Sequence, residues 1–208
     1  MHPVPVAWKW MLPWSLIWFR GLVAPALAWL AALHGQHLIL AGLMVIAFLS
    51  DWLDGVLARR WGTVTARLRR ADTLADTVFY LHVLAIAVTG QWEQIAPLLP
   101  LLGGLLGLEL LCQIISYTRW GCRTATHSYL CKTWGVFLCL ATTELFVWHA
   151  VRESMWICLI VGYIAYLDVI VILCLMPVAA VDVPSALHAW QRRTRPVSGP
   201  IPNAGETA

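Results

Sequence analysis

Four aspartates are the side chains in this sequence best suited to chemistry. They occur as two pairs, Asp51 and Asp54 in Asp-Trp-Leu-Asp-Gly-Val-Leu-Ala-Arg, then Asp72 and Asp76 in Ala-Asp-Thr-Leu-Ala-Asp. The four make up more than a third of the 11 acidic residues in a chain that is 60% hydrophobic. A carboxylate at membrane depth is costly, and it marks by default a functional site that pairs with cations.

The spacing of the aspartates places each pair on one helix face. Asp51 and Asp54 fall within about 100° of one another on a helix, and Asp72 and Asp76, at i and i+4, share a face of the next helix. Two helices would then turn hard oxygen ligands toward a common point. Hard oxygen ligands select Mg²⁺, Mn²⁺ or Ca²⁺ over softer ions, so we predict a site for two divalent ions, with Mg²⁺ or Mn²⁺ favoured, that clamp a phosphate or pyrophosphate during phosphoryl transfer. The alternative is that the aspartates are solvated at helix ends or paired with the arginines at 67–70.

The residues that follow Asp54 suit a phosphate ligand. Gly55 removes a side chain where a bulky phosphate or nucleotide would approach the helix. Ala58 keeps the same face clear. Arg59 follows at the membrane surface, where a guanidinium could hold a phosphate.

The composition identifies the elements that must position these side chains. The 208 residues include 13 Trp, carry only 12% charged residues and have a mean hydropathy of +0.73. This is typical of an all-α integral membrane protein. A membrane span needs about 20 apolar residues, and six stretches are long enough: 14–33, 38–57, 73–90, 95–117, 131–149 and 155–177. We expect one six-span domain over 1–182, with a polar cavity open to the cytoplasm. Residues 183–208 would be a cytoplasmic tail with a short surface helix at 183–193 and disorder from Pro196.

The basic residues predict the orientation. With six spans, both termini lie on one side, together with the connections at 58–72 and 118–132, and this side holds 13 of the 14 Lys and Arg residues. The positive-inside rule places that side, and the aspartates near it, in the cytoplasm. We expect a multi-pass protein of a bacterial inner membrane. The net charge of +3 suits anionic lipid headgroups or phosphorylated substrates and gives no sign of nucleic-acid binding.

Residues 51–76 resemble the signature of the CDP-alcohol phosphotransferase family. The family pattern is D-x-x-D-G-x-x-A-R, eight residues, G, three residues, D, three residues, D. Seven of its eight fixed positions occur here at the family spacing. Leu68 replaces the second glycine, which in the family lies close to the bound nucleotide. The segment from Pro13 to Arg20 also resembles the family's P-N-x-L-T-x-x-R, although Trp14 and Ile17 replace the polar Asn and Thr.

The resemblance implies a function and a set of roles. The family transfers a phosphatidyl or related phosphoalcohol group from a CDP-linked donor, such as CDP-diacylglycerol, to an acceptor hydroxyl and releases CMP. By this resemblance Asp51, Asp54 and Asp72 would bind the metals, and Asp76 would be both a metal ligand and the general base. The CDP pocket would be lined by Gly55, Ala58 and Arg59. The resemblance also implies a homodimer that forms through the membrane spans.

The acceptor side of the site is less marked in the sequence. Arg119, Arg123 and Lys132 lie on the expected cytoplasmic face, where they could bind a phosphorylated alcohol such as glycerol phosphate or inositol phosphate. Equally, they could belong to a positively charged loop that touches anionic lipid.

Two other functions fit parts of the sequence. The protein could be a cation- or proton-coupled transporter that uses its intramembrane carboxylates, with Glu109, Glu144 and Asp168 as further acidic groups in the spans. It could also be an inactive family member that serves as a scaffold. The complete set of four aspartates argues against the scaffold, whereas Leu68 leaves it open.

Overall fold

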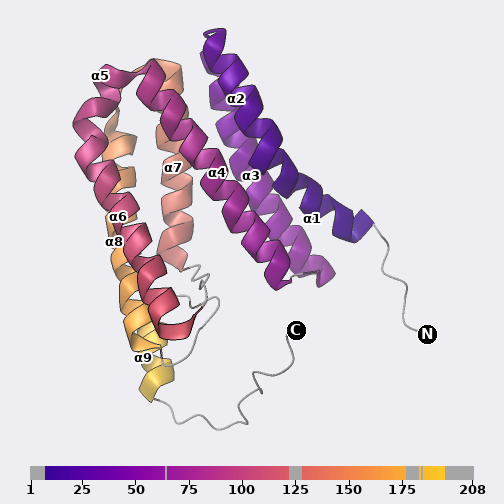
Figure 1. The fold of residues 1–208 in the computed structure, drawn as a ribbon, viewed down its shortest axis with the longest axis vertical. Helices are drawn as coiled ribbons and strands as arrows, with labels where there is room; N and C mark the ends of the chain where they lie inside the picture. Colours follow the sequence, from indigo (N-terminus) through magenta and orange to yellow (C-terminus); the bar gives the residue numbers. More distant parts are fainter. Residues whose placement is uncertain (1–7, 64, 122–127, 177–182, 184, 195–208) are drawn as a thin grey trace.

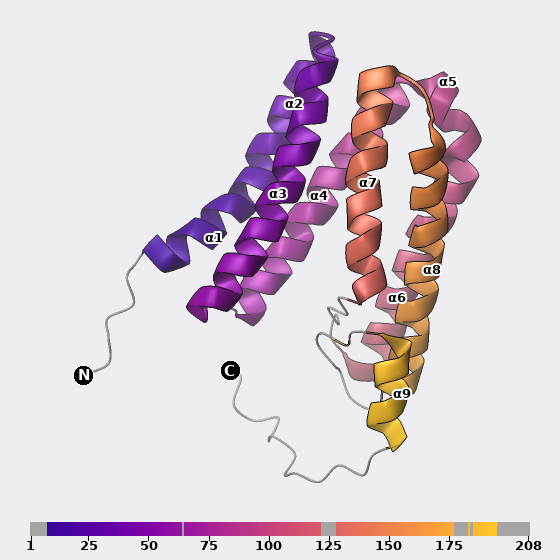
Figure 2. The same cartoon turned by 180° about the vertical axis from the view of Figure 1, so that it is seen from behind.

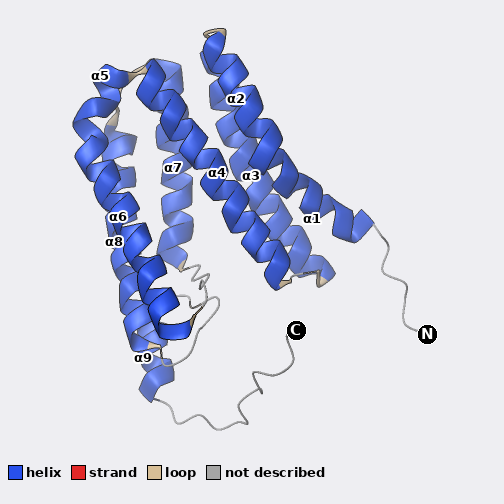
Figure 3. Cartoon of the chain, viewed as in Figure 1, coloured by secondary structure: helices blue, strands red, loops and turns tan. Residues whose placement is uncertain are grey.

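The structure, a computed structural model, describes residues 8–63, 65–121, 128–176, 183 and 185–194, and within these residues it contains helices and no strand (Figures 1 and 3). Six helical segments are long and apolar enough to cross a membrane: Trp8–Leu33, His37–Trp61, Arg67–Gly90, Trp92–Trp120, Tyr129–Trp148 and Glu153–Leu175. Many large apolar side chains are exposed on the outside of these segments, where lipid would cover them. The predicted all-α fold with six spans is confirmed.

The first span is not one regular helix. It consists of α1 (Trp8–Trp18), the π-helical turn η1 (Phe19–Val23) and α2 (Ala24–Leu33). The Ala24 N–H donates to the Phe19 carbonyl, five residues back. Pro25 offers no N–H, and its ring would crowd the carbonyl of Gly21 in a regular helix. The wider π-helical turn thus lies where the proline interrupts the helical hydrogen bonds. Helix α1 is inclined to the axis of α2 (Figure 2).

The second and third spans are joined by a tight link. Helix α3 (His37–Trp61) ends at Gly62, whose φ of 67° lies in the left-handed region. Helix α4 (Ala66–Gly90) begins after Thr65, whose hydroxyl accepts a hydrogen bond from the Leu68 N–H. The predicted connection over 58–72 is therefore wrong in extent. Only residues 62–65 lie between the helices, because both continue past the point where hydropathy falls.

The last three spans form a packed bundle. They comprise α5 (Trp92–Ile95), η2 (Ala96–Leu98), α6 (Leu99–Trp120), α7 (Tyr129–Trp148) and α8 (Glu153–Leu175). Two glycines let aromatic side chains approach the backbone. A Cβ at Gly104 would lie 2.1 Å from the Tyr163 hydroxyl, and one at Gly162 would lie 2.6 Å from Trp134 Nε1. These close approaches lock α6, α7 and α8 together.

One apolar core joins the two halves of the molecule. It contains Met44 of α3, Phe79 of α4, Phe146 of α7 and Leu159 of α8, all nearly fully buried. Helix α7 packs against both α3 and α8 and so links the first three spans to the last three. The carboxylates of α3 and α4 begin about one helical turn beyond the core residues Ala47 and Phe79.

The predicted surface helix of the tail is present as α9 (Ala186–Thr194). Its Ala186 N–H donates to Asp168 Oδ1 at 3.0 Å, and Val183 and Ala189 are buried against Ile172 of α8. The prediction of disorder from Pro196 onward lies outside the described residues.

Candidate metal centre

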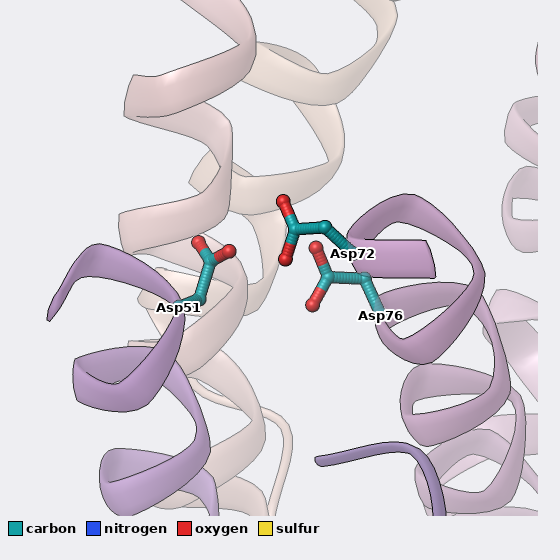
Figure 4. Close-up of side chains that lie close together, drawn as sticks. All are labelled: Asp51, Asp72 and Asp76. Carbon is teal, nitrogen blue, oxygen red and sulfur yellow. The ribbon is translucent and has the colours of Figure 1, made fainter. Parts of the chain in front are cut away.

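Three of the four predicted aspartates meet at one point. Carboxylate oxygens of Asp51, Asp72 and Asp76 all lie within 4.8 Å of one another. In Figure 4, Asp51 projects from one helix, and Asp72 and Asp76 project toward it from another. The expectation that two helices turn carboxylates toward a common point therefore agrees with the structure.

The first span separates the two helices that carry the aspartates. The segment α1–η1–α2 packs against both α3 and α4. Gly21 makes one of these approaches close, since a Cβ there would lie 3.4 Å from the Ala75 Cβ. The link at 62–65 joins α3 and α4 at one end, and the first span sets their separation further along.

Arg20, in η1, connects the whole acidic set. Its guanidinium is 3.5 Å from Asp51, 3.2 Å from Asp54 and 2.5 Å from Asp76, and it also pairs with Asp72. The Arg20 side chain is only 1% exposed. From the sequence, Arg20 was expected only as one of the basic residues on one membrane side and as the last residue of the lead-in pattern, with no role in the site. Its position inside an apolar run is the signal that could have identified it.

The four carboxylates differ in exposure. The Asp54 side chain is 5% exposed, whereas Asp51 is 43%, Asp72 25% and Asp76 34% exposed. The last three can therefore be reached by an ion or a substrate, while Asp54 lies behind them against Arg20. With all four ionised, four negative charges and one guanidinium leave a formal charge of −3.

This donor set fits divalent metal ions. The ligand atoms are hard carboxylate oxygens, which suit Mg²⁺ and Mn²⁺. Three of the carboxylates converge closely enough to hold one ion together. The negative excess that Arg20 leaves is one that a divalent cation would offset.

The predicted nucleotide-binding residues are arranged unequally. Arg59 is exposed, and its guanidinium lies over Gly55, where a Cβ would be 3.5 Å from Arg59 Nη1. Ala58 is 5% exposed and packs with Ile17 and Leu68. Gly55 and Arg59 thus share an accessible face, whereas Ala58 is covered.

An apolar layer lies next to the charged one. Its buried members are Ile17, Ala58, Leu68 and Ala75, with Trp14 and Ala71 packed against them. Ile17 precedes Arg20 by three residues, Leu68 precedes Asp72 by four, and Ala58 follows Asp54 by four. We call these six residues the apolar layer, and Arg20 with its four aspartates the ionic layer. Trp14, Ile17 and Leu68, the residues that depart from the family patterns, all belong to the apolar layer.

Two of the three predicted acceptor-binding residues, Arg119 and Lys132, lie on other helices. Arg119, at the end of α6, donates to the Leu173 carbonyl and, at 3.1 Å, to the Cys174 carbonyl at the end of α8. The Lys132 amino group lies 5.8 Å from the centre of the Tyr129 ring in α7. Arg123 lies outside the described residues. The structure therefore assigns Arg119 a contact with the last turn of α8 and leaves acceptor binding as a prediction.

Comparison with known proteins identifies the family. The profile of the family described as CDP-alcohol phosphatidyltransferase matches residues 10–176. The chain belongs to the CDP-alcohol phosphatidyltransferase family. The match covers all six spans, so the resemblance noted from residues 51–76 is confirmed.

Two curated relatives carry names within this chemistry. The chain is 32% identical over 85 residues to the CDP-diacylglycerol--glycerol-3-phosphate 3-phosphatidyltransferase of Haemophilus influenzae, which is 40% of this chain and 46% of that protein. It is 41% identical over 58 residues to the cardiolipin synthase (CMP-forming) of Streptomyces coelicolor, 27% of this chain and 26% of the relative. The matched regions thus span less than half the length of each relative. No solved structure matches the chain.

Proposed function

We propose that this family member transfers a phosphatidyl or related phosphoalcohol group from a CDP-linked lipid, such as CDP-diacylglycerol, to an alcohol and releases CMP. The observation that carries the proposal is the convergence of Asp51, Asp72 and Asp76 from two helices, within a chain whose residues 10–176 match the family. The names of both curated relatives agree with this type of reaction.

The four aspartates would hold two divalent ions, Mg²⁺ or Mn²⁺. Asp51, Asp72 and Asp76 offer oxygens at the accessible side, and Asp54 supports them from behind. When bound, such ions neutralise pyrophosphate charge and stabilise the charge that develops on the leaving group. The carboxylates fix the ligand positions because they project from helices held apart by the first span.

Asp76 would act as the general base. Its side chain is partly exposed, and it lies beside both Asp51 and Asp72. It would take the proton of the acceptor hydroxyl as that oxygen forms a bond to the donor phosphorus. The bond between this phosphorus and the bridging oxygen breaks, and CMP leaves with the bonding electron pair.

The donor and acceptor would approach from different helices. Arg59 and Gly55 offer a guanidinium and an open backbone to the donor phosphates, with Ala58 next to them on α3. Arg119, Arg123 and Lys132 are the proposed contacts of a phosphorylated acceptor such as glycerol 3-phosphate. Contact of these residues with anionic lipid headgroups is the other role open to them.

The membrane placement is part of the proposal. The aspartates and the link at 62–65 lie at the end of the bundle where basic residues gather, which supports a cytoplasmic active site and cytoplasmic termini in a bacterial inner membrane. We also propose a homodimer formed through the spans, and crosslinking in native membranes would test it.

Purified protein in detergent or lipid nanodiscs, supplied with CDP-diacylglycerol, Mg²⁺ or Mn²⁺ and a panel of alcohols, should release CMP. The panel would include glycerol 3-phosphate, inositol phosphate and phosphatidylglycerol. EDTA and Asp72→Asn should both abolish release. Folded protein that releases no CMP with any acceptor would overturn the proposal for this donor and favour the scaffold.

The transporter is the competing function, and the same preparation tests it. The other acidic side chains in the spans have local partners: Glu109 accepts from Gln113 at 2.7 Å, Glu144 accepts from Ser154, and Asp168 accepts from the Ala186 N–H. These contacts give each carboxylate a local role in packing. Cation flux into proteoliposomes without CMP release would support the transporter instead.

A further inference from the structure

Arg20 is an unusual arginine because one guanidinium contacts four carboxylates. It lies 2.5–3.5 Å from Asp51, Asp54 and Asp76, pairs also with Asp72, and is almost completely buried. A buried charge persists only where opposite charges and hydrogen bonds compensate its desolvation. The burial of Arg20 therefore depends on the four aspartates. In return, Arg20 gives the aspartates a counter-charge that is part of the chain.

The backbone around Arg20 fixes the guanidinium in this place. Arg20 lies within the π-helical turn Phe19–Val23, a rare form of helix that is frequent at functional sites. Gly21 lets this turn approach α4 closely at Ala75. Ile17, one turn before Arg20, is buried in the apolar layer. A side chain held on both sides in this manner is directed into the site by the fold.

Arg20 and a divalent ion would require the same carboxylates. The three that converge closely enough to hold an ion, Asp51, Asp72 and Asp76, are all paired with Arg20. The guanidinium donates a hydrogen bond to Asp72, which occupies an oxygen lone pair there, and its ion pairs with Asp51 and Asp76 add positive charge where the ion would bind. Both effects oppose metal binding, and both favour the acidic cluster before metal arrives.

We propose that Arg20 is a positioning residue and an internal competitor of the metal centre. It offsets part of the negative charge of the four aspartates and holds them in an arrangement that can bind metal, and it is displaced from them as divalent ions bind. This inference rests on the metal centre of the proposed function. Removal of the guanidinium should tighten metal binding and destabilise the metal-free fold. Removal of a residue that only supports the site should instead weaken metal binding.

Mn²⁺ binding to the purified full-length protein tests the inference. Free Mn²⁺ is measured by electron paramagnetic resonance, and thermal unfolding is followed with Mn²⁺ or with EDTA. For Arg20→Gln we expect about tenfold or greater tightening of Mn²⁺ binding, because the repelling charge is gone. The temperature shift on adding Mn²⁺ should also exceed that of the wild type. Arg60→Gln, an exposed arginine near the end of α3, is the matched control and should leave both quantities unchanged.

The possible results separate the two proposals. Wild-type binding that is weakened by Asp51→Asn, but equal or weaker in Arg20→Gln, would overturn the competitor role and leave the metal centre standing. No Mn²⁺ binding by folded wild type would overturn both. If Arg20→Gln does not fold, Arg20→Lys decides, because a single ammonium cannot contact four carboxylates at once. Its Mn²⁺ affinity should exceed that of the wild type, and an affinity at or below it would overturn the inference.

Discussion

The ionic layer and the apolar layer lie side by side on the same three spans, with Ala71 and Ala75 next to Asp72 and Asp76 in the chain, yet they are held together by opposite means. In the ionic layer four carboxylates surround one guanidinium and keep an excess of negative charge. In the apolar layer, Ile17, Leu68 and their neighbours exclude polar groups by packing. The charges of the ionic layer are incompletely balanced by the chain itself, which suits a site that binds cations, whereas the packing of the apolar layer is complete and serves to support the fold.

The largest expected effect concerns catalysis in the ionic layer. Asp76→Asn keeps the shape of the side chain but cannot take a proton, so the rate of CMP release should fall by about 10²–10⁴-fold. The measurement is CMP release from CDP-diacylglycerol with saturating Mg²⁺. Glu93→Gln, in α5, is the control and should retain the wild-type rate. Full turnover by Asp76→Asn would remove this residue from the base role.

The second effect concerns the charge balance of the same layer. Arg20→Ala leaves a buried acidic cluster without its cation, and breaking a buried pair from one side costs about 3–5 kcal/mol. Denaturant unfolding in detergent with EDTA should show this loss of stability. Added Mn²⁺ should restore much of it, because the ion supplies the missing positive charge. A loss that is identical with and without Mn²⁺ would indicate that Arg20 acts only by packing.

The third effect concerns the apolar layer. Leu68→Ala should lower the free energy of unfolding by about 2–5 kcal/mol through the cavity it creates. The volume-conserving Leu68→Met should cost less than about 1.5 kcal/mol. Both values should be the same in EDTA and in Mn²⁺, because packing does not depend on the ion. A Leu68→Ala defect that Mn²⁺ repairs would show that the two layers are coupled rather than separate.

The smallest effect concerns Thr65, the N-cap residue of α4. Thr65→Ala removes the oxygen that accepts from the Leu68 N–H, and loss of such a cap costs about 1 kcal/mol. A melting temperature lowered slightly, with Mn²⁺ affinity unchanged, is the expected result. Thr65→Ser keeps the oxygen and should match the wild type. A large change in Mn²⁺ affinity would mean that the start of α4 also sets the positions of the carboxylates.

The sequence predicted the ionic layer far better than the apolar one. Aspartates are conspicuous in an apolar chain, and their helical spacing reports which of them share a face. Ile17 and Leu68 gave no such signal, because an apolar residue in a membrane span is equally at home against lipid or against a neighbouring helix. They belong to one buried cluster although they are 51 residues apart in the chain, and only the packing of the spans can bring such positions together.

Two other features, the role of Arg20 and the start of α4, were not predicted correctly from the sequence, and each has a physical reason. Arg20 was interpreted through topology, because its partners lie 31 to 56 residues further along the chain and no local pattern reports them. The start of α4 was placed too late, at 73, because Arg67, Arg69 and Arg70 lower the hydropathy there. Hydropathy marks the part of a helix that suits the bilayer core, whereas hydrogen bonding continues beyond it.

The π-helical turn at Phe19–Val23 affects how sequences of this family should be aligned. A hydrogen bond that spans five residues instead of four accommodates one additional residue in the turn. A relative with a regular helix here would therefore need one residue fewer between the positions of Pro13 and Pro25 to keep both ends in register. In an alignment, a single-residue gap inside this first span would mark the gain or loss of the π-helical turn. Such gaps are ordinarily assigned to loops.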